Sequence, residues 1–411
     1  MRPLRITYLH QYFNTPNMAG STRSFEMARR LVSAGHDVHM VTTWREETKD
    51  AGWFMTKEAG INVHWLPLPY SNHMSFGQRI RAFVRFAWAA ARKAASLEAD
   101  VLFATSTPLT IALPGIWASR RKRIPMVFEV RDMWPDVPIA LGVLRNRLLI
   151  KLARSLERTA YKRSSRIVAL APGMREDIIA KGVPAEYVSV IPNGCDLELS
   201  NGRSGNQDPR AMYSWLSERP MLLYAGAIGK ANGVDYLVHV AGKLAELNPA
   251  VCVVVIGDGK ERSRVNDLAA SLGVSGKNFF LLDQLPKKDL AGWLRAADIH
   301  VALMRGPASY TRDAVNNKFF DALACGKPIA NNFSGWQATI AEENGVGIAL
   351  DPNDAVASAR RIVEALKDKD WLAAVPSRTR NLATGRFSRD SQAADLERIL
   401  VEAVNGTGVS H

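Results

Sequence analysis

Short runs of branched and aromatic residues alternate with helix-like segments along nearly the whole chain. In the first half, strands are expected at 4–9, 38–41, 61–65, 101–104, 126–130 and 167–170. In the second half, strands are expected at 221–225, 251–256, 279–282, 299–303, 329–330 and 348–350. Strands that alternate with helices pair in parallel and are covered on both faces. The sequence therefore predicts an α/β protein with two doubly wound, Rossmann-like sheets.

The chain of 411 residues is too long for one ordinary core, so we expect two domains. A strand that ends in a turn at 188–196 and the polar, Gly/Ser-rich run 199–209 have the composition of a boundary. We expect one domain over 1–198 and a second over 210–387, facing each other across a hinge. A last helix, at about 388–411, is expected to pack back on the first domain.

Composition narrows the class of protein. Apolar residues make up 47% and charged residues 23%, which is typical of a folded soluble protein. No run of about 18 uncharged apolar residues occurs, and the start of the chain leads directly into a strand, so we expect a cytoplasmic location. Cys195, Cys252 and Cys325 are far apart and lack metal-site spacing. We expect neither a disulfide framework nor a metal site.

The positive charge is concentrated in the first half. Residues 1–200 hold 28 Lys and Arg against 17 Asp and Glu, a net charge of +11, whereas residues 201–411 hold 25 against 23, a net charge of +2. An asymmetry of this kind favours contact with a polyanion, either nucleic acid or an anionic membrane surface.

Three basic segments of the first half also carry apolar residues. They are an expected helix at 78–93, the cluster Arg120–Arg123 and a basic stripe over 147–162 beside several leucines. One face of the helix at 78–93 is predicted to consist of Ile80, Phe83, Val84, Ala87, Trp88 and Ala91. With the exposed-looking Met133–Pro135, these segments favour a membrane-facing surface. Alternatively, both apolar helix faces simply cover the sheet.

Glycines follow several expected strands. In open α/β sheets, ligands bind beyond the carboxyl ends of the strands. Gly20, after the first strand, would let the backbone approach a phosphate; alternatively it is a turn glycine before Ser21 as a helix cap. Gly226 begins a glycine turn in the second half, and Asp258 lies in the next one, 257–259. A phosphorylated nucleotide fits these two turns.

The stretch 312–328 places two acids eight positions apart. A helix that opens after Asn316 and Asn317 offers unpaired N–H groups to an anion, and Lys318 adds a full charge. Asp321, one turn further in, is placed to accept two hydrogen bonds from a ribose diol. Alternatively, Asn316 only caps the helix, and Asp313 and Asp321 are solvated.

These motifs resemble the GT-B glycosyltransferases of retaining family 4 over nearly the whole chain. The matching segments are 190–194 for the interdomain motif, 224–226 through 233–235 for the first donor-domain strand, loop and helix, 256–259 for the next glycine turn, and Asp313 and Asp321 for the family's pair of glutamates. The segments 129–135, 317–321 and 331–336 are most similar to bacterial enzymes that build O-antigen, capsule or other surface glycans, some of the fucosaminyltransferase type.

The resemblance implies a nucleotide diphosphate-sugar donor, expected to be UDP-linked, and no cofactor. The C-terminal domain would hold the donor, with Asp321 at the ribose and Asp313 at the sugar. Relatives commonly have an arginine and a lysine where this chain has Ala227 and Asn232, so Lys230 and Lys318 are the cations expected at the diphosphate. Where many relatives have a histidine, this chain has Arg131, for which an electrostatic or a structural role is expected.

The implied activity is metal-independent transfer of a hexosyl or aminosugar group, with retention, to a polyprenyl diphosphate-linked glycan. The first domain would face the acceptor, and the enzyme would attach peripherally to the inner face of the plasma membrane. Three alternatives remain open: a nucleotide-sugar epimerase of the same fold, a nucleic-acid-binding protein, and a non-catalytic partner subunit. We expect no nucleic-acid partner. Nucleic acid would explain the positive charge, but it would not explain why Asp313, Lys318 and Asp321 lie together around the start of a helix.

Overall fold

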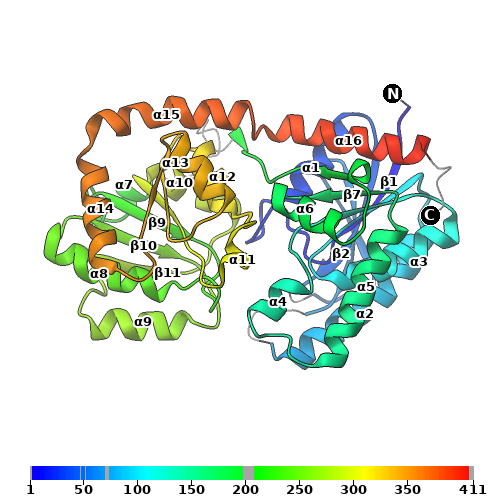
Figure 1. Cartoon of the computed structure of the whole chain (residues 1–411), viewed down its shortest axis with the longest axis horizontal. Helices are drawn as coiled ribbons and strands as arrows, with labels where there is room; N and C mark the ends of the chain where they lie inside the picture. Colours follow the sequence, from blue (N-terminus) through cyan, green and yellow to red (C-terminus); the bar gives the residue numbers. More distant parts are fainter. Residues whose placement is uncertain (1, 47, 51, 70–73, 198–207, 407–411) are drawn as a thin grey trace. The chain divides into compact units, whose positions relative to one another are not determined.

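The chain forms two compact units. The computed structural model describes residues 2–46, 48–50, 52–69, 74–197 and 208–406. The first unit comprises 1–15, 21–192 and 389–411, and the second comprises 16–20 and 193–388 (Figure 1). Most of the expected linker at 199–209 lies outside the described residues.

The first unit is built on an eight-stranded sheet in the order β3-β4-β2-β1-β5-β6-β7-β8. Its strands are β1 Arg5–Leu9, β2 Asp37–Trp44, β3 Phe54–Glu58, β4 Ile61–Pro67, β5 Val101–Thr105, β6 Met126–Val130, β7 Arg166–Ala169 and β8 Val188–Val190. All neighbours pair in parallel except β3 and β4. The edge strand β3 was not expected; it is joined to β4 by Ala59 and Gly60, both at positive φ, which is the signature of a tight hairpin.

Helices cover the first sheet. They are α1 Arg23–Ser33, α2 Phe76–Ser96, α3 Ala112–Lys122, α4 Asp136–Ala140, α5 Arg147–Arg163, α6 Pro172–Ala180 and α16 Arg389–Asn405, with short 3₁₀ turns at Leu109–Ile111 and Ala185–Tyr187. The last helix, α16, belongs to this unit: Asp390 accepts a hydrogen bond from Arg30 at 2.6 Å, and Glu397 lies 3.0 Å from the His36 ring.

In the first unit, the exposed fractions of side chains exclude one alternative for α2 and contradict the expectation for Met133. The buried face of α2 is made of Ala82, Phe86, Ala87, Ala90 and Ala94. Val84 and Trp88, which the sequence places on the apolar face of this helix, are 57% and 63% exposed, so the alternative that this face simply covers the sheet is wrong for these two residues. Small alanines allow α2 to lie close to α3 and the sheet, so the bulky residues point outward. Met133, expected on the surface, is only 6% exposed.

The second unit is a six-stranded, all-parallel sheet in the order β11-β10-β9-β12-β13-β14. Its strands are β9 Met221–Ala225, β10 Cys252–Ile256, β11 Phe279–Leu282, β12 Ile299–Ala302, β13 Ile329–Asn331 and β14 Gly347–Ala349. Its helices are α7 Pro209–Met212, α8 Asp235–Leu247, α9 Arg262–Ser271, α10 Lys287–Ala296, α11 Ala308–Thr311, α12 Asn317–Ala324, α13 Trp336–Glu343, α14 Ala355–Lys367 and α15 Lys369–Thr384.

The strand order reverses once in each sheet: between β1 and β5 in the first unit, and between β9 and β12 in the second. In open parallel sheets, such reversals leave a crevice at the carboxyl ends of the strands, where ligands bind. The loops that follow these four strands are therefore the places to look for a site. Among the described residues, no helix combines the length and apolar character needed to cross a bilayer.

Candidate functional site

Two glycine turns meet beyond the carboxyl ends of β9 and β10, on one side of the strand reversal of the second unit. Gly226 follows β9 at φ +155°, and its N–H donates to Ile256 O of β10 at 2.9 Å. A Cβ at Gly257 would lie 1.9 Å from Gly226 O, and a Cβ at Gly259 would lie 2.4 Å from Ile228 O. Only glycine permits this close contact between the two turns.

Lys318 reaches the first of these turns from helix α12. The N-cap Asn316 accepts from the Lys318 N–H at 3.1 Å, so the expected cap is confirmed. The Lys318 Nζ lies 4.4 Å from the centre of the Tyr224 ring, and a Cβ at Gly226 would lie 2.8 Å from it. Burial lowers the pKa of Lys318 to about 8, with Asp321 opposing the shift. Burial destabilises the charged form of Lys318, and an anionic ligand bound beside the ammonium would stabilise it.

Asp321 is paired with a cation that sequence reasoning missed. Lys287, the first residue of α10, places its Nζ 2.6 Å from Asp321 Oδ1, with only 15% and 18% of the two side chains exposed. The alternative that Asp321 is a solvated first-turn acid is therefore wrong. The pair brings a second cation near Lys318, although its charge is largely balanced by Asp321.

The loop that carries Asp313 is braced by the start of α13. A Cβ at Gly335 would lie 2.4 Å from Thr311 O. Gln337 accepts from the Asn316 N–H at 2.7 Å and donates to Asn316 O at 3.2 Å. Asp313 itself is buried, 7% exposed, and accepts from Arg312 Nη2 at 2.6 Å, so it too is not a solvated acid.

The other residues predicted to bind the nucleotide sugar lie in separate parts of the structure. Asn317 accepts from Asn193 Nδ2 at 2.8 Å, next to the interdomain motif. Asp258 accepts the Ile228 N–H at 2.9 Å through its backbone oxygen, which links the two glycine turns. Lys230 is exposed on its turn. Gly20 is exposed at φ +126°, in the segment 16–20 that belongs to the second unit.

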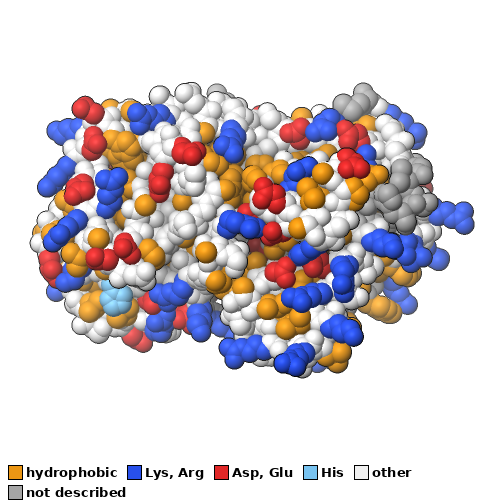
Figure 2. Space-filling model, viewed as in Figure 1, with side chains coloured by type: hydrophobic (Ala, Val, Ile, Leu, Met, Phe, Trp, Pro, Cys, Tyr) orange, Lys and Arg blue, Asp and Glu red, His pale blue; other side chains and the backbone are white. Residues whose placement is uncertain are grey.

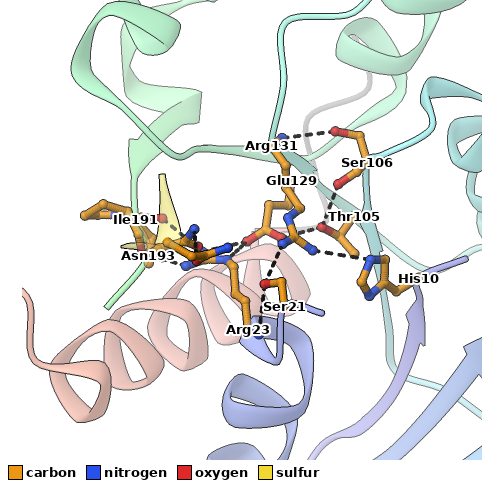
Figure 3. Close-up of polar contacts among 11 residues, drawn as sticks. His10, Ser21, Arg23, Thr105, Ser106, Glu129, Arg131, Ile191 and Asn193 are labelled. Carbon is orange, nitrogen blue, oxygen red and sulfur yellow. Dashed lines mark hydrogen bonds and ion pairs between the residues drawn. The ribbon is translucent and has the colours of Figure 1, made fainter. Parts of the chain in front are cut away.

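In the first unit, the Arg131 guanidinium is oriented by two residues of the loop between β1 and α1, at the strand reversal (Figure 3). Its Nη1 lies 3.3 Å from His10 Nε2, and its Nη2 donates to Ser21 Oγ at 3.3 Å. Burial and the Arg131 charge push the pKa of His10 well below its ordinary value. A neutral His10 accepts from the guanidinium at Nε2, which puts its proton on Nδ1, a buried atom with no partner among the described residues.

Behind this group lies a fully buried ion pair. Arg23 donates to Glu129 Oε1 from Nη2 at 2.7 Å and from Nε at 3.1 Å, and the two side chains are 1% and 0% exposed (Figure 3). Arg23 also donates to Ile191 O at 2.9 Å and to Pro192 O at 2.6 Å. Burial alone would raise the pKa of Glu129, but the charges of Arg23 and Arg131 bring it below its ordinary value. The pair fixes Ile191 and Pro192, the last residues of the first unit before the chain enters the second.

The structure thus brings Gly226, Lys318 and Asp321 together in the second unit and places Arg131 in the first. Sequence reasoning missed His10, Arg23, Lys287 and Gln337, whose partners lie at least 21 residues away along the chain. The position of His10 directly after β1 was a usable signal, because that loop flanks the strand reversal.

Known families account for most of the chain. A family model described as "Glycosyl transferase 4-like domain" matches residues 20–194, and one described as "Glycosyl transferases group 1" matches residues 208–382. A protein of Escherichia coli K12 described as a colanic acid biosynthesis glycosyl transferase, WcaI, is 24% identical over 73% of this chain and 76% of its own length. The lipopolysaccharide core biosynthesis glycosyltransferase LpsE of Rhizobium meliloti is 26% identical over 56% of this chain and 62% of its own length.

Solved structures of the same fold cover nearly the full chain. Sucrose-phosphate synthase from Thermosynechococcus elongatus aligns with a TM-score of 0.75 and 17% identity, over 98% of this chain and 100% of that one. Anabaena HepE, in complex with UDP and glucose, aligns with a TM-score of 0.69 and 17% identity, over 97% and 100%. The two matched domains and this shared architecture agree with the fold described above. The chain belongs to the glycosyltransferases of the GT-B fold, with a glycosyl transferase 4-like domain followed by a glycosyl transferases group 1 domain.

Proposed function

We propose that this glycosyltransferase takes a hexosyl or aminosugar group from a UDP-linked donor and transfers it, with retention and without a metal, to a polyprenyl diphosphate-linked glycan. The product would be a bacterial surface polysaccharide of the O-antigen or capsule kind. Relatives in colanic acid and lipopolysaccharide core synthesis support this class of product. The HepE structures with UDP and with UDP-glucose support the donor class.

The observation that carries the proposal is Lys318 beside the open backbone of Gly226. A diphosphate seated on the glycine turns would meet the Lys318 ammonium and the N–H groups at the start of α12. Charge develops on the diphosphate as the sugar bond breaks, so these groups would stabilise the transition state more than the bound donor. Asp321 would accept hydrogen bonds from the ribose, and Asp313 would contact the sugar.

Arg131 is proposed to serve an anionic group of the substrates in the first unit. Its guanidinium is held by His10 and Ser21, while its backbone N–H donates to Ser106 Oγ at 3.0 Å. A preorganised cation loses little entropy when an anion binds. The excess positive charge of the first half supports an acceptor carried on a lipid diphosphate, and peripheral attachment of the enzyme to the inner face of the membrane.

The test is a panel of UDP-sugars, screened by thermal shift and then assayed with a polyprenyl diphosphate-linked acceptor. A ligand at one hundred times its Kd stabilises by about 2.7 kcal/mol, which such a screen detects. The anomeric configuration of the product is read by NMR, and turnover is measured again with a chelator present. Loss of activity with the chelator contradicts metal independence, and an inverted anomer contradicts retention. Epimerised sugar released without an acceptor would identify an epimerase, and absence of any nucleotide binding would identify a non-catalytic subunit.

A further inference from the structure

Three neighbouring helices of the first unit are almost free of acidic residues. Helices α2, α3 and α5 carry five, three and six Lys or Arg residues, respectively. The one acid among them, Glu157 of α5, is buried and pairs with Lys181 at 2.6 Å. Figure 2 shows Lys and Arg side chains gathered over the part of the molecule where Figure 1 draws α2 and α5. The exposed charges of these three helices are therefore all positive.

The same helices expose large apolar side chains. The exposed fractions are 57% for Val84, 63% for Trp88, 46% for Leu113, 46% for Trp117, 65% for Leu148 and 56% for Leu152. The alternative that the apolar face of the 147–162 segment simply covers the sheet is wrong, because only Glu157, Ala160 and Tyr161 of α5 are buried. Several exposed apolar residues on adjoining helices mark an interaction surface.

An open groove of about 810 Å³ runs between α3 and α5. Leu113, Trp117 and Leu152 are among its apolar lining residues, and the arginines of the α3 end border it. Those arginines are Arg120, Arg121 and Arg123. The groove therefore combines a hydrocarbon-lined floor with cations at one end.

Both exposed tryptophans lie under arginines. The Arg92 guanidinium carbon is 3.8 Å from the centre of the Trp88 ring, and that of Arg121 is 5.9 Å from the centre of the Trp117 ring. Tryptophan and arginine with this arrangement suit the headgroup level of a bilayer, where the ring contacts acyl chains and the cation meets phosphate.

We infer that the outer face of α2, α3 and α5 docks onto an anionic phospholipid bilayer, with the α3–α5 groove seating part of one phospholipid. Its arginines bind the phosphate, and its apolar floor contacts the acyl chain. A second copy of this face is a poor occupant, because the like charges repel. Nucleic acid would use the arginines but would leave Leu148 and Leu152 in water. This inference deepens the membrane attachment proposed above.

The first experiment measures binding of the full chain to vesicles of phosphatidylcholine, alone or mixed with phosphatidylglycerol, at low and high salt. The variant R120Q/R121Q/R123Q removes the cations of the groove, and R360Q/R361Q removes two exposed arginines of α14 in the second unit as a matched control. At about fivefold per cation, the triple variant should partition on the order of a hundredfold more weakly to anionic vesicles at low salt. The control should bind like the wild type.

The second experiment tests insertion of apolar groups. Brominated phospholipids quench tryptophans that reach the acyl region, and W117F should lose part of that quenching. The variant L148S/L152S should also bind more weakly, whereas L247S/L272S, which changes two leucines of the second unit exposed by 45% each, should not. Equal binding to neutral and anionic vesicles, unchanged binding of the triple variant, or absence of quenching would overturn the inference.

A nucleic-acid surface would give a different pattern. Duplex RNA or DNA would bind and vesicles would not, and L148S/L152S would leave that binding unchanged; this outcome also overturns the inference. Vesicle binding is measured without substrate, and binding of UDP by each variant reports on the second unit. A failure of membrane docking is therefore distinguishable from a failure of the proposed glycosyl transfer.

Discussion

Lys287 Nζ lies 2.6 Å from Asp321 Oδ1, so the acid proposed for the ribose is already held by a cation of α10. We predict that Asp321→Asn weakens UDP binding by about 1.5–3 kcal/mol, the usual value of hydrogen bonds to a charged group. Lys287→Gln removes only the ion pair that holds this carboxylate, so it should weaken UDP binding by less than Asp321→Asn does. Asp321→Glu restores the residue type of the family and should bind nearly as the wild type does. Calorimetry measures all three, and wild-type affinity in Asp321→Asn would refute the ribose assignment.

If Lys318 meets the donor diphosphate as proposed, donor binding should depend on pH. Its pKa is lowered to about 8 in the free protein, and a bound diphosphate raises it again. Above pH 8 the donor therefore binds with uptake of a proton, and its affinity should fall by up to about tenfold per pH unit. Lys318→Arg stays charged, so its profile should be flat between pH 7 and 9. If donor affinity falls equally steeply with pH in the wild type and in Lys318→Arg, Lys318 does not contact the diphosphate.

Gly335 packs against the backbone of the loop that carries Asp313. At φ +154°, an alanine Cβ would lie 2.4 Å from Thr311 O and 2.9 Å from Arg312 O, so Gly335→Ala should displace Asp313. We expect turnover to fall by at least about tenfold, while UDP affinity changes little. Gly276→Ala is the control: its φ is +70° and its Cβ would meet no atom within 4 Å. Similar kinetics for the two variants would contradict the bracing role.

The sequence predicted the two parallel sheets because their buried strands are dense in branched residues and separated by helical patterns. It did not predict β3, whose burial alternates between intermediate and exposed at the sheet edge. The sequence placed Ala87 on the same apolar face of α2 as Val84 and Trp88, whereas the structure buries Ala87 and exposes the other two, because small alanines allow α2 to pack closely against α3. In the candidate site, Lys318, Asp321 and the glycine turns could be identified from short motifs in the sequence. Lys287 and His10 act through contacts distant in sequence, which no local pattern encodes.

His300 should make the protein less stable in mild acid. It is fully buried on β12, its Nε2 lies 2.9 Å from Leu294 O, and burial lowers its pKa to about 4. Unfolding returns the pKa to about 6.5, so between pH 6.5 and 4 the unfolded chain binds more protons, and stability falls as the pH falls. The contribution of this residue is about 1.4 kcal/mol per pH unit at most. His300→Gln keeps a donor for Leu294 O and should give a shallower loss in urea unfolding; an unchanged slope would contradict this account.

The Arg23–Glu129 pair should be coupled more strongly than any surface ion pair of the chain. Arg23→Met leaves the Glu129 carboxylate buried without the two guanidinium N–H groups that donate to its Oε1, and should cost about 3–5 kcal/mol of unfolding free energy. Glu129→Gln in the same chain removes the charge, so the double variant should recover at least about 2 kcal/mol of that loss. The remainder reflects the carbonyls of Ile191 and Pro192, which Arg23 no longer satisfies. Arg398→Met, which removes exposed ion pairs with Asp395 and Glu402, serves as the control and should change stability by less than about 1 kcal/mol. Additive effects of Arg23→Met and Glu129→Gln in denaturant titrations would show that the two side chains act independently.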